Sequence, residues 1–220
     1  MKIKSAANLE KYTSLVFDCD GVILNSNRVK TNAFYNSALP YGAEAAQSLA
    51  NYHKENGGIS RYKKFDHFLK HMIPKGISGP NIDELLETYA SQVMEGLLKC
   101  ELVPGLDSLR AKTMHANWLI VSGGDQKELR EIFNARDLNY LFDGGIYGSP
   151  ETKELIISRE QINGKIKTPA VFFGDSKYDF SASTSAGLDF VFVMSWSEIH
   201  APLEWAHNNN LNTINSIADL

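Results

Sequence analysis

The stretch Leu15-Val16-Phe17-Asp18-Cys19-Asp20-Gly21-Val22 decides how this chain folds. Its first three residues form an apolar run that predicts a buried strand, and two acids follow where that strand ends. Because side chains alternate along a strand, Asp18 and Asp20 point to one side and Cys19 to the other. Gly21 then allows the chain to turn sharply. The stretch therefore predicts two neighbouring carboxylates at the end of a buried strand.

Two acids this close repel each other unless a cation neutralises them. A divalent metal would do so, and oxygen ligands favour Mg²⁺. One acid could then be a nucleophile, and the other could move protons. The same Asp-x-Asp-Gly pattern also occurs in surface turns and calcium loops. A helix–loop–helix calcium loop would continue with further oxygen ligands, whereas Val22-Ile23-Leu24 follows here. The surface turn is the alternative that stays open.

The composition is that of an ordinary globular protein. The 220 residues suffice for one domain with an insert or for two small domains, and 43% of them are hydrophobic. No apolar run is long enough to span a bilayer, and residues 6–11 are too polar for a signal-peptide core, so we expect a cytoplasmic protein with no membrane partner. A net charge of −4 argues against a nucleic-acid partner. Cys19 and Cys100 fit neither a disulfide framework nor a zinc spacing. The oligomeric state stays open between a monomer and a small homo-oligomer.

Four apolar runs predict strands, at residues 15–17, 118–121, 170–173 and 190–193. Helical patterns at 126–134, 153–161 and 179–186 separate the later runs. Buried strands that alternate with helices predict a doubly wound, parallel α/β sheet covered on both faces. Ligands of such sheets bind beyond the carboxyl ends of the strands. The polar residues that end the first three runs should therefore converge on one site.

Residues 27–99 have a different texture and predict four helices, at 28–39, 43–55, 60–73 and 82–99. A helical block inserted after the first strand of an α/β domain suggests a lid over the strand ends. We therefore divide the chain into a core domain, residues 1–26 and 100–220, and a helical cap domain, residues 27–99. Extra helices within a single core are the alternative. The basic residues of this block that we expect on solvated helix faces are His53, Lys54, Lys63, Lys64 and His67.

Three further features could share a site with the first two acids. Ser122 follows an apolar strand, and its hydroxyl with the amides of Gly123 and Gly124 could cradle phosphate oxygens, although Ser-Gly-Gly is also a common turn. Lys153 begins a predicted helix, where the helix dipole disfavours a cation, although single lysines are usually solvated. Gly174-Asp175-Ser176-Lys177-Tyr178-Asp179 ends another strand with two acids one helical turn apart, the second of which could instead be an N-terminal helix acid.

Taken in order, these pieces resemble the motifs of the haloacid dehalogenase-like (HAD) hydrolase superfamily. The resemblance rests on Asp18-Cys19-Asp20-Gly21-Val22, Ser122, Lys153 and Gly174-Asp175-Ser176-x-x-Asp179. It covers the predicted core and implies a Rossmann-like fold, and the inserted helices fit the helical cap of that superfamily.

The resemblance also implies roles for these residues. Asp18 would attack phosphorus and become an aspartyl phosphate, and Asp20 would protonate the leaving oxygen and then take a proton from water. Ser122 and Lys153 would hold the phosphoryl oxygens. Because dehalogenating and most phosphonate-cleaving members lack the second acid, Asp20 points to a phosphate ester as the substrate.

The metal expected from the resemblance is Mg²⁺. Its ligands would be Asp18, the main-chain carbonyl of Asp20, and Asp175, while Asp179 would orient the metal shell or ligate the ion. A metal, a lysine and oriented amides would together supply the electrostatic field that phosphoryl transfer requires.

Gly57-Gly58-Ile59-Ser60-Arg61 looks like the Gly-x-Ser-Arg segment in the cap of β-phosphoglucomutase-like members. By that resemblance Arg61 would grip a far anionic group of the substrate, with Ser60 and the Gly58 backbone beside it. The alternative makes Ser60 a helix N-cap and Arg61 a solvated residue of the first turn.

These expectations combine into a Mg²⁺-dependent phosphatase that acts on a small phosphorylated metabolite, a sugar phosphate or related ester. A β-phosphoglucomutase-like phosphomutase is the first alternative. Gly174 stands where such mutases often have a second acid, which favours the phosphatase. An inactive binding or regulatory member is the second alternative, and the intact set of motif residues argues against it.

Overall fold

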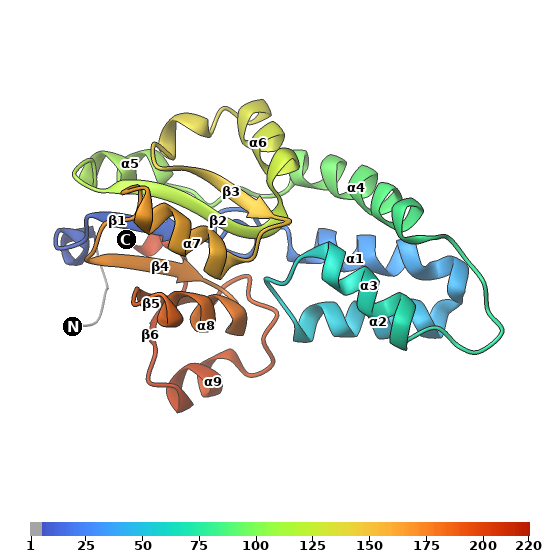
Figure 1. Ribbon diagram of the computed structural model, residues 1–220. Coiled ribbons are helices and arrows are strands. Elements are labelled where there is room, and N and C mark those ends of the chain that lie inside the picture. The colour runs from blue at the N-terminus through green and yellow to red at the C-terminus, as the bar shows by residue number, and fades with distance from the viewer. Residues whose placement is uncertain (1–5) are drawn as a thin grey trace.

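The computed structural model describes residues 6–220. Its centre is a parallel sheet in which β1, Ser14–Phe17, lies between two strands that come much later in the sequence (Figure 1). The sheet has six strands in the order β3-β2-β1-β4-β5-β6. The other strands are β2 (Asn117–Asp125), β3 (Gly145–Ser149), β4 (Ala170–Gly174), β5 (Asp189–Val193) and β6 (Asn212–Ile214). This is the strand order of doubly wound, Rossmann-like sheets, so the predicted fold class is confirmed.

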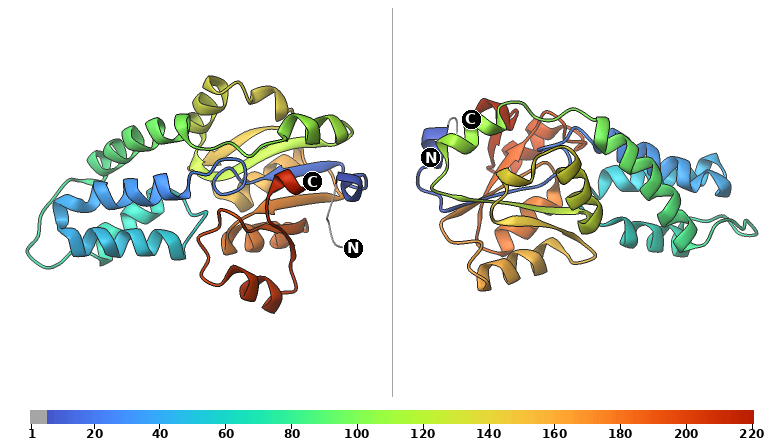
Figure 2. Two further views of the ribbon diagram at one scale, coloured as in Figure 1. Left: turned by 180° about the vertical axis from the view of Figure 1, so that it is seen from behind. Right: turned by 90° about the horizontal axis from the view of Figure 1, so that it is seen from above.

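The alternation of side chains along β1 divides the core between the two faces of the sheet. Leu15 and Phe17 belong to one apolar cluster, and Val16 belongs to the other. Helices α5 (Leu106–Lys112) and α6 (Gln126–Ala135) contribute to the first cluster, and α7 (Lys153–Ile162), α8 (Lys177–Ser185) and α9 (Pro202–Asn208) lie over the second face. Figure 2 shows the two helical layers from behind and from above.

Four helices of residues 27–99 extend beyond the sheet, on the side where the strands have their carboxyl ends (Figures 1 and 2). They are α1 (Asn27–Ala38), α2 (Ala43–Glu55), α3 (Arg61–His71) and α4 (Ile82–Lys99). Their own core is aromatic, because the rings of Phe34 and Tyr89 lie 4.4 Å apart and those of Phe34 and Phe65 lie 5.1 Å apart. The predicted bounds of α2 and α4 agree with the structure, and an Asn81 capping box begins α4.

Several short elements complete the chain. Single turns of 3₁₀-helix lie at Ala6–Leu9, Leu39–Tyr41, Asn139–Leu141 and Ile217–Asp219. Among residues 6–220, no helix combines the length and the apolar character needed to cross a bilayer.

The structure differs from the sequence prediction in the strands at and near the sheet edges. β3 and β6 were not predicted, because β3 has two glycines among five residues and β6 has only three residues. β2 continues to Asp125, so Ser122, Gly123 and Gly124 lie within a strand rather than after one. The pairing of β2 with β3 is irregular between Val121 and Asp125, which is where this segment runs past the site.

Candidate active site

Successive strands are added to the sheet in opposite directions on the two sides of β1: β2 and β3 lie on one side, and β4, β5 and β6 lie on the other. Doubly wound sheets bind ligands at this switch point, which here lies between β1 and β4. Asp18 directly follows β1, and Asp175 directly follows β4. The amide of Asp18 donates to the Phe173 carbonyl over 2.9 Å, which holds the two strand ends together. Gly21 has a φ of +74°, and a Cβ there would lie 2.1 Å from Oδ2 of Asp175. The turn after β1 therefore requires glycine, because any side chain would collide with the second strand end.

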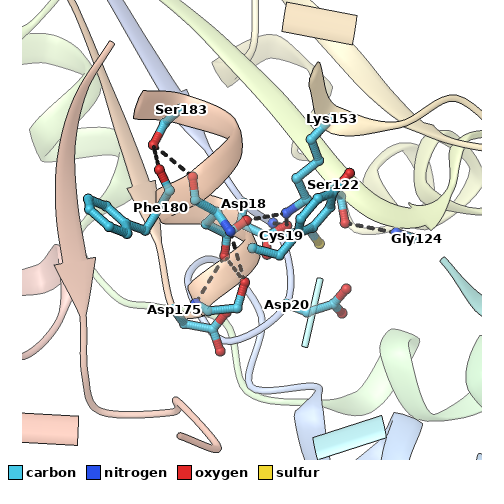
Figure 3. A network of polar contacts seen from close by, with 12 residues as sticks. Asp18, Cys19, Asp20, Ser122, Gly124, Lys153, Asp175, Phe180 and Ser183 are labelled. Carbon is cyan, nitrogen blue, oxygen red and sulfur yellow. Dashed lines mark hydrogen bonds and ion pairs between the residues drawn. The ribbon is translucent and has the colours of Figure 1, made fainter. Parts of the chain in front are cut away.

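Lys153 joins two of the acids. It is the first residue of α7 and is only 1% exposed. Its Nζ lies 3.0 Å from Asp18 Oδ1 (Figure 3). It also lies 2.5 Å from Asp179 Oδ1. Burial alone would lower the pKa of Lys153, but the two carboxylates outweigh it and hold the pKa above its ordinary value. The predicted lysine is therefore a buried ammonium group between Asp18 and Asp179.

Asp179 combines two of the roles considered from the sequence. Its Oδ2 accepts hydrogen bonds from the Ser176 amide at 3.0 Å and the Ser176 hydroxyl at 2.6 Å, in a capping box at the start of α8. Its Oδ1 holds Lys153. Since both oxygens have partners, the geometry of Asp179 suits a residue that fixes Lys153 and the helix start better than it suits a direct metal ligand.

The buried acids form a cluster that is compatible with a divalent metal. Asp18, Asp175 and Asp179 each offer a carboxylate oxygen, and these oxygens lie within 4.8 Å of one another. Burial raises the pKa of Asp175 well above its ordinary value, and the nearby Asp179 and Asp18 raise it further. Burial likewise raises the pKa of Asp18, against the opposing effect of Lys153. One lysine among three acids leaves an excess of negative charge, and hard oxygen donors suit Mg²⁺. Asn27 Nδ2 donates to Asp175 Oδ2 over 2.8 Å and orients that carboxylate.

Asp20 lies between the core and the four helices. Its Oδ1 accepts a hydrogen bond from the Ser26 hydroxyl at 2.6 Å, and its Oδ2 forms a close ion pair with Lys30 of α1. Burial would raise the pKa of Asp20, but Lys30 and Ser26 outweigh it and hold the pKa below its ordinary value. Asp20 is therefore a carboxylate in this arrangement. No motif in the sequence marks Lys30. It lies one helical turn after Ser26, so both side chains are on the same side of the helix and both contact Asp20.

Ser122 is fully buried beside Lys153 and Asp18 (Figure 3). Its hydroxyl accepts a hydrogen bond from the Gly124 amide over 3.0 Å. The Gly124 amide is thus already engaged, so the cradle suggested by the sequence reduces to the Ser122 hydroxyl and the Gly123 amide. Cys19 is buried with its side chain in the apolar core, as the strand alternation predicts.

This constellation agrees with the comparison with known protein families. The family model for haloacid dehalogenase-like hydrolases matches residues 15–193. The chain belongs to this family. A search of curated proteins found no match.

Solved structures share the fold of this HAD hydrolase. A predicted phosphoglycolate phosphatase from Haemophilus somnus is 18% identical, with a TM-score of 0.71, over 96% of this chain and 97% of its own. A β-phosphoglucomutase from Clostridium difficile is 20% identical, with a TM-score of 0.70, over 95% of this chain and 93% of its own. At such identities the similarity is evidence for the fold and not for a shared substrate.

A cavity of about 590 Å³ lies between the strand ends and the four helices of the HAD hydrolase. Asp18, Asp20 and Asp175 line it from the core, and Arg61 and Lys64 line it from α3. The cavity therefore connects the predicted reacting groups with the predicted cap residues.

Gly58, between α2 and α3, touches β2 of the core. A Cβ on Gly123 would lie 2.0 Å from the Gly58 carbonyl oxygen, so the two backbones are in direct contact. Ser60 precedes α3 but makes no side-chain capping bond. It lines a smaller pocket of about 70 Å³ together with Lys153.

Arg61 is buried, so the alternative of a solvated arginine is wrong. Its Nη1 lies 2.7 Å from Glu128 Oε2 on α6, and its guanidinium lies 4.5 Å from the centre of the Tyr89 ring. Among the described residues its Nη2 has no hydrogen-bond partner, and Arg61 lines the main cavity. The guanidinium therefore connects the helical segment to the core through an ion pair and keeps one donor nitrogen unused.

The expectation of solvated faces is also wrong for two other basic residues. Lys64 is 1% exposed and His53 is 7% exposed, and both line the main cavity. Lys54 and Lys63 are exposed as predicted, and His67 is partly buried.

Proposed function

We propose that this HAD hydrolase is a Mg²⁺-dependent phosphatase that cleaves a small phosphorylated metabolite through a phosphoryl group on Asp18. The placement of the Asp18 carboxylate carries the proposal. Its Oδ1 is fixed by Lys153 at 3.0 Å and by the Cys19 amide at 2.7 Å. Among residues 6–220, no hydrogen bond engages its Oδ2, which leaves that oxygen available for attack.

The reaction would proceed in two displacements. Asp18 attacks phosphorus, the bond to the ester oxygen breaks, and Asp20 in its acid form gives that oxygen a proton. Water then attacks the phosphoryl group, Asp20 takes a proton from the water, and Asp18 is released. The carboxylate form of Asp20, which Lys30 and Ser26 favour, is the form required for the second step.

Charge neutralisation is the main task of the other residues. Lys153 and the Gly123 amide would hold phosphoryl oxygens, and Ser122 would add its hydroxyl. Mg²⁺ held by Asp18 and Asp175 would neutralise further charge on the transferred group. Because phosphate monoesters are very stable in water, with enhancements of up to about 10²¹-fold on record for their enzymes, such a field is needed for turnover.

We further propose that α1–α4, within residues 27–99, act as a cap over a core of residues 1–26 and 100–220. The cavity between the two parts has the size of a small-metabolite site, which supports a sugar phosphate or a related ester as the substrate. Gly58, Ser60 and Arg61 would contact the part of the substrate that does not react. Closure of the cap would exclude bulk water from the reacting phosphoryl group.

The phosphomutase remains a second candidate because the Gly57–Arg61 segment resembles that subgroup and Gly58 and Arg61 line the cavity. A mutase must hold a bisphosphate intermediate while it reorients. Gly174 argues against it, because a Cβ there would lie 2.4 Å from the Asp179 Cβ and leaves no room for a second acid.

The test is a panel of phosphorylated metabolites and p-nitrophenyl phosphate, assayed for phosphate release with Mg²⁺ and with a chelator. We expect release with Mg²⁺ that the chelator abolishes and added Mg²⁺ restores. Isomer formation that outpaces phosphate release would favour the mutase. No release from any ester, by a folded protein with Mg²⁺, would overturn the proposal.

A further inference from the structure

The wall of the cap cavity contains a buried pair of basic side chains, Lys64 of α3 and His53 of α2. Lys64 Nζ lies 2.6 Å from His53 Nδ1. Burial lowers the pKa of His53 well below its ordinary value, and nearby lysines lower it further, so the imidazole is neutral. When Lys64 is an ammonium group, the neutral ring must accept from it at Nδ1 and so carries its own proton at Nε2. Among the described residues this Nε2 has no hydrogen-bond partner. In that form the pair presents donors only.

Four lysine and arginine side chains of residues 27–99 line the cavity, of which Lys54 is exposed and the other three are buried. Of the buried three, Lys30 is paired with Asp20 and Arg61 is paired with Glu128. Within residues 6–220, Lys64 has no ion pair with any carboxylate. A buried ammonium group without a counter-ion is unfavourable, so its retention in a binding cavity requires an explanation.

The other charged groups near Lys64 do not supply its counter-ion. Lys30 and Lys153 disfavour its protonated form, while Asp20 and Glu198 favour it from a distance. Glu198 instead accepts a hydrogen bond from the Thr31 hydroxyl at 3.1 Å. Burial and these neighbours together lower the pKa of Lys64 to about 7, so an anion that arrives beside it would restore the ammonium form near neutral pH.

We propose that Lys64 and His53 form a subsite for a carboxylate group of the substrate, which makes a phosphorylated carboxylic acid the substrate class. The inference rests on the proposed phosphatase function. Asp18 and Lys64 line the same cavity, so one small molecule can meet both. One buried unpaired cation matches the single charge of a carboxylate better than the nearly double charge of a second phosphate. The assignment also moves the recognition of the far anionic group from Arg61, which already holds Glu128, to Lys64.

The test uses O-phosphorylated hydroxy acids of increasing length, each paired with its carboxamide, together with bisphosphate analogues and p-nitrophenyl phosphate. We expect the wild type to prefer the best acid over its amide by about 30-fold or more in kcat/KM. Lys64→Met should reduce this ratio to near one, and Lys64→Arg should retain part of it. Lys70→Met removes an exposed lysine from the same helix and should keep the wild-type ratio.

The outcomes separate the subsite from the proposed function. If the wild type hydrolyses p-nitrophenyl phosphate but treats acids and amides alike, the subsite is refuted and the phosphatase stands. If it prefers bisphosphates to acids, the carboxylate assignment is likewise refuted. If it hydrolyses no ester, the proposed function itself fails. A purely structural role for Lys64 would lower turnover of acids and amides equally and leave their ratio unchanged. If the Lys64 variants do not fold, a wild-type ratio near one still refutes the subsite.

Discussion

Gly123→Ala tests whether contact between cap and core controls the reaction. The substitution keeps the Gly123 amide and adds a single methyl group. That methyl would lie 2.0 Å from the Gly58 carbonyl oxygen, whereas a Cβ hardly ever approaches a neighbour within 3.0 Å. The atoms that this methyl would meet are all backbone atoms of Gly58, which cannot rotate away as a side chain could. The cap must therefore move by about 1 Å or more. A displacement of about 1 Å at a reacting centre can lower the rate about 100-fold, which corresponds to about 2.7 kcal/mol.

The assay is kcat/KM for the best ester of the panel, with circular dichroism as the check on folding. Gly124→Ala is the matched control, because its added methyl would meet side-chain ends of Leu129 and Lys30 at 3.3 Å rather than backbone atoms at 2.0 Å. We expect a loss of about 100-fold for Gly123→Ala and a much smaller loss for Gly124→Ala. A folded Gly123→Ala protein with kcat/KM within threefold of the wild type would refute the reasoning. Equal losses in both variants would show that any added methyl on this strand disturbs the site.

Three further predictions concern the reacting acid, the ion pair between cap and core, and the buried lysine. Asp18→Asn should fold but lose turnover and any acid-stable phosphoryl label, since an amide is a poor nucleophile; retained activity would contradict the mechanism. Arg61→Met should lower the free energy of unfolding in urea by about 3–5 kcal/mol because it leaves Glu128 buried and unpaired, and adding Glu128→Met should recover most of that loss; an additive double variant would contradict the pairing. Lys64→Met should raise the free energy of unfolding by up to about 5 kcal/mol below pH 7, because the folded-state pKa of Lys64 is about 7 against an ordinary value of 10.5. The cost of burying the charged ammonium group is complete below a pH of about 7 and disappears as the pH rises towards 10.5. The stability advantage of Lys64→Met should therefore shrink between about pH 7 and pH 10, and a pH-independent difference would contradict the prediction.

The central sheet and its reacting end could be predicted from the sequence because their signals are local. Apolar runs mark β1, β2 and β4, and a polar residue follows each run. The carboxyl ends of parallel strands share one edge, so a parallel sheet places Asp18 and Asp175 at the same edge. Lys153 was singled out because a lysine opposes the dipole at a helix start, and the structure gives that lysine two buried acids as partners.

The cap side of the cavity could not be predicted in the same way. His53 and Lys64 are polar residues in amphipathic helices, and a polar residue in such a helix is expected to face solvent. Their burial depends on how α2 and α3 pack against each other and above the sheet, which no local pattern records. The partner of Arg61 is 67 residues away in sequence, on α6 of the core. Its pairing therefore becomes visible only once the inserted helices and the core are in place.

The contacts between cap and core also connect the position of the cap with the protonation of Asp20. Lys30 belongs to α1, while Asp20 belongs to the turn that follows β1. Their ion pair holds the pKa of Asp20 below its ordinary value. If α1 moves away with the cap, Asp20 loses this cation and its acid form becomes easier to populate. In the proposed mechanism Asp20 is an acid when the ester oxygen leaves and a base when water attacks, and the cap is closed for both steps. Lys30 at its present position favours the base form, so proton transfer to the ester oxygen requires Lys30 to move away from Asp20.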